Sequence, residues 1–206
     1  MPYRLPLLLA LLVLVPGAAS LMAGGPVVGD VVVTRTLQAL LGETPAWAGP
    51  VTDMAKAPWL WASMVLAVGL AFLSAGGLRA FSPLLAYGFA WGADQIFRSL
   101  IYVSRPDAAL VHVASASSSS GLPSTFGLVF GALFGVALWM KNDSLQARIA
   151  LAVCFLLMLA GGAARIVLGG HWLSQMLPSF ALGILLAGIA VWVFGRIEAL
   201  FPGKVS

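Results

Sequence analysis

An arginine and a histidine close together in the chain are the first residues whose types could do chemistry. Arg165 and His171 belong to the stretch Arg-Ile-Val-Leu-Gly-Gly-His-Trp-Leu-Ser-Gln at 165–175, which lies between two long apolar runs. A guanidinium offers a planar fork of donors to phosphate oxygens, and Gly169 and Gly170 allow close approach of the chain. His171, one of two histidines, adds an imidazole. Taken alone, it also fits an interfacial histidine bound to a backbone carbonyl.

Two further arginines close an earlier apolar run. Arg98 and Arg105 are seven residues apart, about two helical turns, so both can face the same way. Pro106 ends the helix there, and Asp94 lies one turn before Arg98 and can pair with it. Ionisable residues inside an apolar span are candidates for function, although an ordinary interfacial ion pair would have the same pattern.

A predicted helix start follows the second arginine cluster. Pro123 stands where this helix begins, with Ser124 and Thr125 in its first turn. The free amides of a first turn and the positive end of the helix dipole favour anions. In a membrane topology this helix start and the two arginine clusters fall on the same side. Together they predict one phosphate site.

The composition indicates that lipid surrounds most of the chain. Of 206 residues, 61% are hydrophobic and only 9% are charged, with a mean hydropathy of +1.01, whereas a soluble domain carries about 25% charged residues. Backbone groups in lipid must be satisfied internally, so the apolar runs should be helices. The net charge of +4 fits loops near lipid head groups and not nucleic-acid binding. Cys154 is the single cysteine, which excludes an internal disulfide.

The apolar runs predict an all-α, polytopic membrane protein with six transmembrane helices in one bundle, a single domain over residues 1–206. Each run is near the ~20 residues that a bilayer requires. The predicted spans are Leu5–Ala23, Pro58–Ala75, Phe81–Tyr102, Ser124–Met140, Leu145–Leu168 and Trp172–Phe194. The first could be a cleaved signal peptide, but a retained helix is favoured because the orientation below needs the N-terminus inside.

Between the first two spans, a short amphipathic helix is predicted from Asp30 through Leu41. Asp30 would cap it, and Thr34, Arg35 and Gln38 would form its water-facing side.

The basic residues predict the orientation. With the N-terminus in the cytoplasm, the inner bases are Arg4, Arg79, Lys141, Arg148, Arg196 and Lys204, and the outer bases are Arg35, Lys56, Arg98, Arg105 and Arg165. Three of the outer bases belong to the predicted phosphate site, and the others leave an excess inside. We therefore expect an integral protein of a bacterial inner membrane, with the site facing the periplasm or the cell exterior.

The order and spacing of the three clusters resemble the type-2 phosphatidic acid phosphatase superfamily of membrane lipid phosphatases. That family's pattern is Lys-x6-Arg-Pro, then Pro-Ser-Gly-His, then Ser-Arg-x5-His-x3-Asp. This chain has Arg98-x6-Arg105-Pro106, then Pro123-Ser124-Thr125-Phe126, then Ala164-Arg165-x5-His171-x3-Gln175. The resemblance covers the third to sixth spans by motif and the remainder by topology.

The resemblance implies a role for each matched residue. His171 would attack phosphorus and form a phosphohistidine. The phosphate would be bound by Arg98, Arg105, Ser124 and Arg165, helped by the amide of Thr125. The family uses no metal, and neither a metal site nor another cofactor is expected. The implied partners are a phosphorylated lipid substrate and the membrane, with undecaprenyl diphosphate and phosphatidylglycerophosphate as the expected substrates.

Two departures from the family pattern affect proton handling. Phe126 stands where the family has the histidine that protonates the leaving oxygen, and Gln175 stands where the family has the aspartate that orients the nucleophile. Two explanations remain open: a natural phospholipid-binding relative without normal turnover, or an engineered, inactivated phosphatase. His112, in the loop before the second motif, is an alternative proton donor or simply a histidine at the wet interface. The rival function is a non-catalytic protein that binds or transports a lipid phosphate.

Overall fold

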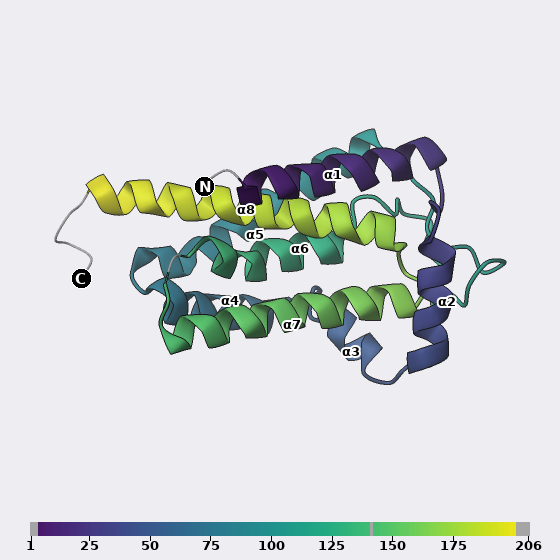
Figure 1. The fold of residues 1–206 in the computed structure, drawn as a ribbon, viewed down its shortest axis with the longest axis horizontal. Helices are drawn as coiled ribbons and strands as arrows, with labels where there is room; N and C mark the ends of the chain where they lie inside the picture. Colours follow the sequence, from purple (N-terminus) through teal and green to yellow (C-terminus); the bar gives the residue numbers. More distant parts are fainter. Residues whose placement is uncertain (1–3, 141, 201–206) are drawn as a thin grey trace.

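The computed structural model describes residues 4–140 and 142–200, and these residues form helices without any strand (Figure 1). The helices are α1 Arg4–Ala23, α2 Asp30–Leu41, α3 Ala48–Asp53, α4 Trp59–Ala75, α5 Ser82–Leu100, α6 Thr125–Phe134, α7 Leu145–Val167 and α8 Leu173–Leu200, with 3-10 turns η1 Leu78–Phe81 and η2 Gly135–Trp139.

The long helices lie side by side along the longest axis of the molecule, and α2 lies across one end of them (Figure 1). Three helices, α1, α7 and α8, are long and apolar enough to cross a membrane. The helix α4 and the stretch Thr125–Trp139 are shorter apolar segments. The all-helical prediction is confirmed, and these spans make the chain an integral membrane protein.

The predicted spans agree with the helices to within a few residues, except at two places. The fourth predicted span divides into α6 and the tighter turn η2. The short helix α3 was not predicted, because Gly49 and Pro50 indicate a break; both lie in its first turn, where proline removes no intrahelical hydrogen bond. Lys141 and Lys204, which contribute to the predicted orientation, lie outside the described residues.

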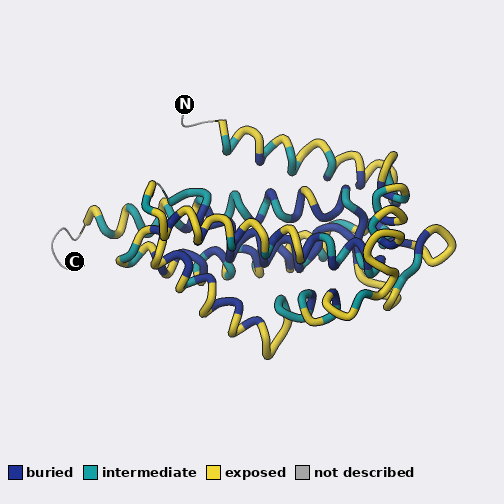
Figure 2. Tube along the Cα trace, turned by 60° about the horizontal axis from the view of Figure 1, so that its bottom comes forward, coloured by how far each residue is buried: buried dark blue, intermediate teal, exposed yellow. Residues whose placement is uncertain are grey.

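The centre of the bundle is α6, in which every residue from Phe126 to Phe134 is buried. Burial is concentrated where the helices face one another, whereas α1 exposes much of its surface (Figure 2). A Cβ on Gly131 would lie 2.5 Å from the carbonyl oxygen of Phe180, so a side chain there would collide with the backbone of α8. Glycine at this position therefore lets α6 and α8 approach closely.

The helix α2 has the predicted bounds, but the face that was predicted to be exposed is the buried one. Asp30, Thr34 and Gln38 are buried, whereas Val32 and Leu40 are exposed. Asp30 is also not the cap, since Gly29 takes that position. The prediction that Thr34 and Gln38 face water was wrong. The ends of α7 and α8 offer backbone groups that need polar partners, and Gln38 and Asp30 bond to them. The Thr34 hydroxyl is buried beside them without a hydrogen-bond partner among the described residues. Arg35 alone of the predicted polar face is exposed.

Candidate active site

Three segments far apart in the sequence meet at the end of the bundle that α2 crosses. They are the end of α5 with the loop that follows it, the start of α6, and the connection from α7 to α8. Arg105 Nη1 donates to the carbonyl of Gly170 at 3.2 Å, and Gln175 Nε2 donates to the carbonyl of Ser104 at 2.7 Å. The structure thus brings the three predicted clusters together.

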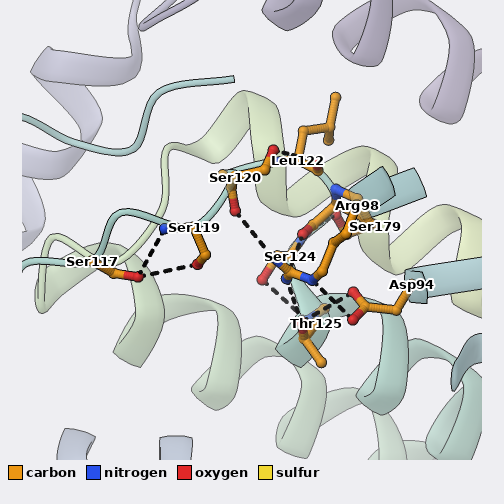
Figure 3. Close-up of polar contacts among 12 residues, drawn as sticks. Asp94, Arg98, Ser117, Ser119, Ser120, Leu122, Ser124, Thr125 and Ser179 are labelled. Atoms are coloured by element: carbon orange, nitrogen blue, oxygen red, sulfur yellow. Dashed lines mark hydrogen bonds and ion pairs between the residues drawn. The ribbon is translucent and has the colours of Figure 1, made fainter. Parts of the chain in front are cut away.

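Arg98 is the most fully engaged residue of the predicted site (Figure 3). Its Nε donates to Asp94 at 2.9 Å, and Nη2 donates to the carbonyl of Pro123 at 3.2 Å and to the hydroxyl of Thr125. The Thr125 hydroxyl in turn donates to Asp94 at 3.0 Å. This closed network ties the last turn of α5 to the first turn of α6, so Arg98 stabilises the site more directly than it offers donors to a ligand.

Ser124 is the N-cap of α6. Its hydroxyl accepts from the amide of Gly127 at 3.4 Å, and its own amide donates to the Ser179 hydroxyl of α8 at 2.8 Å. The residue is fully buried. Ser124 therefore anchors the start of α6 against α8, and a phosphate at this helix end would meet the amide of Thr125 and the positive end of the dipole.

Arg105 reaches across the loop that precedes α6. Its Nε donates to the carbonyl of Ser119 at 2.9 Å, and Nη2 donates to the hydroxyl of the same serine at 2.8 Å. Together with the bond to Gly170, these contacts join the serine-rich segment to the histidine-bearing loop. The serine run at 117–120 is thus partly fixed by Arg105.

Arg165, in the last turn of α7, has a buried donor without a partner. Its Nε is buried and finds no hydrogen-bond partner among residues 4–140 and 142–200. A Cβ on Gly170 would lie 2.9 Å from Nη2 of Arg165, so the absence of a side chain at 170 makes room for this guanidinium. A buried guanidinium donor without a partner is costly unless an acceptor arrives, and phosphate is such an acceptor.

His171 lies in the short connection between α7 and α8 and is 1% exposed. Its Nδ1 is 2.9 Å from the carbonyl oxygen of Gly121. Because a carbonyl only accepts, Nδ1 carries the hydrogen, and Nε2 of the neutral ring keeps its lone pair. An imidazole in this tautomer is a competent nucleophile at Nε2.

Burial and charge both favour the neutral form of this imidazole. Desolvation lowers the pKa of His171 well below its usual value, and the nearby charges of Arg165 and Arg105 lower the pKa further. The Gly121 carbonyl and the Gln175 amide oppose this lowering only in part. His171 is therefore uncharged at neutral pH.

The side chain of Gln175 is fully buried and is occupied with the backbone around it. Its Nε2 bonds to Ser104, as described above, and its Oε1 accepts from the amide of Trp172 at 3.2 Å. This amide ties the start of α8 to the loop after α5.

The backbone carbonyl of Gly121, a residue that was not predicted, is the hydrogen-bond partner of His171 at Nδ1.

Phe126 directly follows Thr125 in the first turn of α6, but its side chain lies in the apolar core. Its ring stacks on Phe130 at a centroid distance of 4.2 Å and meets Phe180 edge to face at 6.5 Å. Gly161, one turn before Arg165 in α7, makes room for this ring. Phe126 thus closes the floor of the site with aromatic packing and contributes no polar group.

The helix α2 supplies two site-supporting residues: Asp30, which was predicted to cap the helix, and Gln38, which was predicted to face water. Asp30 accepts from the amide of Ser174 at 3.0 Å and from its hydroxyl at 2.7 Å, in the first turn of α8. Gln38 donates to the carbonyl of Val167 at 2.9 Å, at the end of α7, and to that of His112 at 2.8 Å. These bonds fasten both ends of the connection that carries the catalytic candidate. The i, i+4 spacing of Asp30, Thr34 and Gln38 is the signal in the sequence.

His112, the alternative proton donor, has a different neighbour. Its Nδ1 is 3.4 Å from the carboxylate of Glu43, whose side chain is 66% exposed. This contact fits a histidine at the wet interface.

Comparisons with known proteins agree with this arrangement. The sequence profile of the PAP2 superfamily matches residues 79–198. No curated protein sequence matches the chain. Among solved structures, the fold is similar to that of a transmembrane PAP2-type phosphatidylglycerolphosphate phosphatase from Bacillus subtilis, with a TM-score of 0.68, 18% sequence identity, and coverage of 97% of this chain and 98% of that one.

Proposed function

From the premise that this chain belongs to the PAP2 superfamily, we propose that it hydrolyses the terminal phosphate of a membrane lipid through a phosphohistidine at His171. The observation that carries the proposal is the pairing of two buried groups. One is a neutral imidazole held at Nδ1 by a backbone carbonyl, which leaves Nε2 as the atom with the lone pair. The other is the Arg165 guanidinium, whose buried Nε finds no partner among the described residues. A nucleophile beside a desolvated anion-binding group is the arrangement that phosphoryl transfer needs.

The proposed membrane arrangement has six spans, with the N-terminus in the cytoplasm and the site at the extracytoplasmic face. It counts α4, the α5 region and the α6–η2 segment as spans beside α1, α7 and α8. The support is the excess of basic residues that the described part of the chain has at the opposite end of the bundle, namely Arg4, Arg79, Arg148 and Arg196. For a bacterial chain, this face is the periplasm or the cell exterior.

A groove of about 420 Å³ between α1, α2, α7 and α8 suits the tail of the lipid. Its lining is apolar and includes Ile166 and Leu173. Ile166 follows Arg165 in α7. Leu173, the first residue of α8, lies two positions after His171. A hydrocarbon chain in this groove would bring its head group to the site.

The proposed reaction has two displacements. His171 Nε2 donates its lone pair to phosphorus, and the bond from phosphorus to the lipid oxygen breaks, with the electron pair leaving on that oxygen. Water then attacks phosphorus, the N–P bond breaks with its pair returning to Nε2, and the proton lost by water balances the one taken up by the departing oxygen. Arg165, Arg105 and the start of α6 stabilise the charge on the phosphoryl oxygens.

The identity of residue 126 predicts which lipid phosphates turn over. Phe126 has no proton to give, and loss of a general acid costs on the order of 10²–10⁴ in rate. A lipid monophosphate must expel an alkoxide, which needs that proton, whereas a lipid diphosphate expels a phosphate group that tolerates negative charge. Turnover should therefore favour a diphosphate such as undecaprenyl diphosphate over phosphatidylglycerophosphate, the substrate class in the name of the Bacillus subtilis protein.

The test is release of inorganic phosphate from both lipid classes by purified protein in detergent. We expect diphosphate turnover by the parent and none by His171→Ala. Restoring histidine at Phe126 should raise monophosphate turnover by a larger factor than diphosphate turnover. Equal activity of His171→Ala and the parent would refute the proposal.

A non-catalytic lipid-phosphate binding or transport protein is the second candidate. Phe126 and Gln175, which replace both proton-handling residues of the family pattern, favour it. In that case the parent would bind a lipid diphosphate without releasing phosphate, and the Phe126→His, Gln175→Asp double variant would gain turnover from a negligible level.

A further inference from the structure

The group that faces Nδ1 of His171 is a backbone atom, the carbonyl oxygen of Gly121. The imidazole Nδ1 is 2.9 Å from the Gly121 carbonyl oxygen, fifty residues earlier in the chain. Both residues lie in the connections at the same end of the bundle. A buried histidine with one such bond has a defined ring orientation and a defined tautomer.

Gly121 is itself fixed by the backbone around it. Its amide donates to the carbonyl of Val103 at 2.7 Å. The preceding residue, Ser120, accepts from the amide of Val103 at 3.2 Å and donates to the carbonyl of Leu122 at 2.7 Å. Val103 and Ser120 are both buried. The carbonyl that faces His171 is therefore held by a short, internally bonded stretch of chain.

Gln175 completes this arrangement by packing against the face of Gly121. A Cβ on Gly121 would lie 2.5 Å from Nε2, 2.6 Å from Oε1 and 2.7 Å from Cδ of Gln175. The glutamine cannot move away freely, because its amide bonds to Ser104 and Trp172. The amide plane of Gln175 thus occupies the space that a side chain at 121 would need.

We propose that Gly121 is a positioning residue of the reaction, whose backbone carbonyl holds Nδ1–H of His171 and aims Nε2 at phosphorus, with Gln175 as the strut that keeps this carbonyl in place. The inference rests on the proposed phosphohistidine function. It explains how a chain without the family's aspartate can retain a correctly oriented nucleophile. The carbonyl has no net charge, so it selects the tautomer without strongly favouring the imidazolium form.

The tautomer can be measured without any turnover. The chain has only two histidines, so ¹⁵N-histidine labelling, with a purification tag free of histidine, gives two imidazole signals. A His112→Gln variant identifies the signal of His171. We expect the Nδ1–H tautomer for His171 near neutral pH. The Nε2–H tautomer, or a charged ring, would overturn the proposal whatever the activity of the protein.

Variants at the two contact residues test the strut. Gly121→Ala should lower kcat by about 100-fold, the cost of a misplacement on the order of 1 Å, and should change the ¹⁵N signal of His171. Gln175→Ala removes the strut, so it should also lower kcat and change the signal. Because it makes room for the new methyl group as well, adding it to Gly121→Ala should cost less than the two single changes together. A Gly121→Ala protein that is folded and keeps both the parent signal and the parent kcat would refute the role of Gly121.

These outcomes separate the inference from the proposed function. If His171→Ala is as active as the parent, the nucleophile is wrong, whatever the tautomer. If His171 is required but adopts the Nε2–H tautomer, the nucleophile stands and the positioning role of Gly121 fails.

Discussion

The two sides of the site use arginine in different ways. On one side, which we call the Arg98 side, Arg98, Asp94 and Thr125 form a closed network that also includes backbone carbonyls. On the other, the Arg165 side, the Nε donor of Arg165 has no partner among the described residues, and the His171 ring is held at Nδ1 by a backbone carbonyl. The same residue type thus joins two helices on one side and stands ready for an anion on the other.

This contrast shows what a motif can and cannot reveal. The spacing of Arg98, Arg105 and Arg165 predicts that they gather at one end of the bundle, and the structure brings them there. Whether the donors are free depends on neighbours from other segments, such as Thr125 beside Arg98. The chain has arginine at position 98, where the family pattern has lysine, and threonine at position 125, where the pattern has glycine. The Arg98 guanidinium donates a hydrogen bond to the Thr125 hydroxyl.

The largest effect should come from breaking the network on the Arg98 side. Arg98→Ala leaves the carboxylate of Asp94, which is 5% exposed, without its cation. Because the Arg98 side chain is 24% exposed, we expect a loss of about 3 kcal/mol in the free energy of unfolding, at the low end for a buried pair. Denaturant unfolding in detergent micelles measures it.

The matched control removes both partners of that pair. An Asp94→Leu, Arg98→Leu double variant leaves no buried charge and should lose less stability than Arg98→Ala. If Arg98→Ala keeps the parent stability but loses phosphate binding, Arg98 is a ligand-binding residue and the contrast between the two sides disappears.

A smaller effect, seen in binding and not in folding, is expected on the Arg165 side. Arg165→Ala removes the donor that has no partner among the described residues. We expect a loss of about 2 kcal/mol, roughly 30-fold, in affinity for a lipid phosphate analogue, with little change in stability. Calorimetric titration provides the affinity. Unchanged affinity with reduced stability would make Arg165 a structural residue like Arg98.

Removing a hydrogen bond from α2 to the site should have a smaller effect than either arginine variant. Gln38→Leu leaves the carbonyls of Val167 and His112 without their side-chain donor, which should cost about 1–2 kcal/mol in stability. Because Val167 is the last residue of α7, directly before the connection that carries His171, kcat should fall together with the stability. Leu40→Gln, on the exposed face of the same helix, is the control. An equal response of the two variants would show that the buried face of α2 does not support the site.

The smallest expected effect is a shift in pH dependence. The Arg165 charge lowers the pKa of His171, so Arg165→Gln should raise that pKa toward its usual value. Since the neutral imidazole is the nucleophile, the acidic limb of the kcat/KM profile should move to higher pH. A limb that stays in place or moves to lower pH would separate Arg165 from the imidazole.

The sequence predicts helix positions better than helix faces. Hydrophobic runs locate the long helices to within a few residues because apolar length is what a bilayer requires. The polar stripe of Asp30, Thr34 and Gln38 predicts an amphipathic α2, but it does not say which face is inside. At the end of a membrane bundle, an apolar face can lie against lipid while the polar face bonds to helix ends.

The same limit applies to the site. Motif spacing identifies Arg165 and His171 because these side chains carry the chemistry. It cannot identify Gly121, whose contribution is a carbonyl that any residue type possesses. Only the fold, which places position 121 beside position 171, makes that carbonyl a partner of the imidazole. The apolar surroundings of Phe126 likewise depend on Phe130, Phe180 and the gap at Gly161.

The central claim, that His171 on the Arg165 side is the nucleophile, is tested most directly by trapping the phosphorylated protein. A lipid diphosphate with a ³²P-labelled terminal phosphate would be mixed with the parent and quenched in base, where phosphohistidine survives, and the labelled peptide would be identified. We expect the label on the peptide that contains His171, its loss in His171→Ala, and its retention in His112→Gln. Label on another residue, or turnover that persists in His171→Ala, would contradict the account.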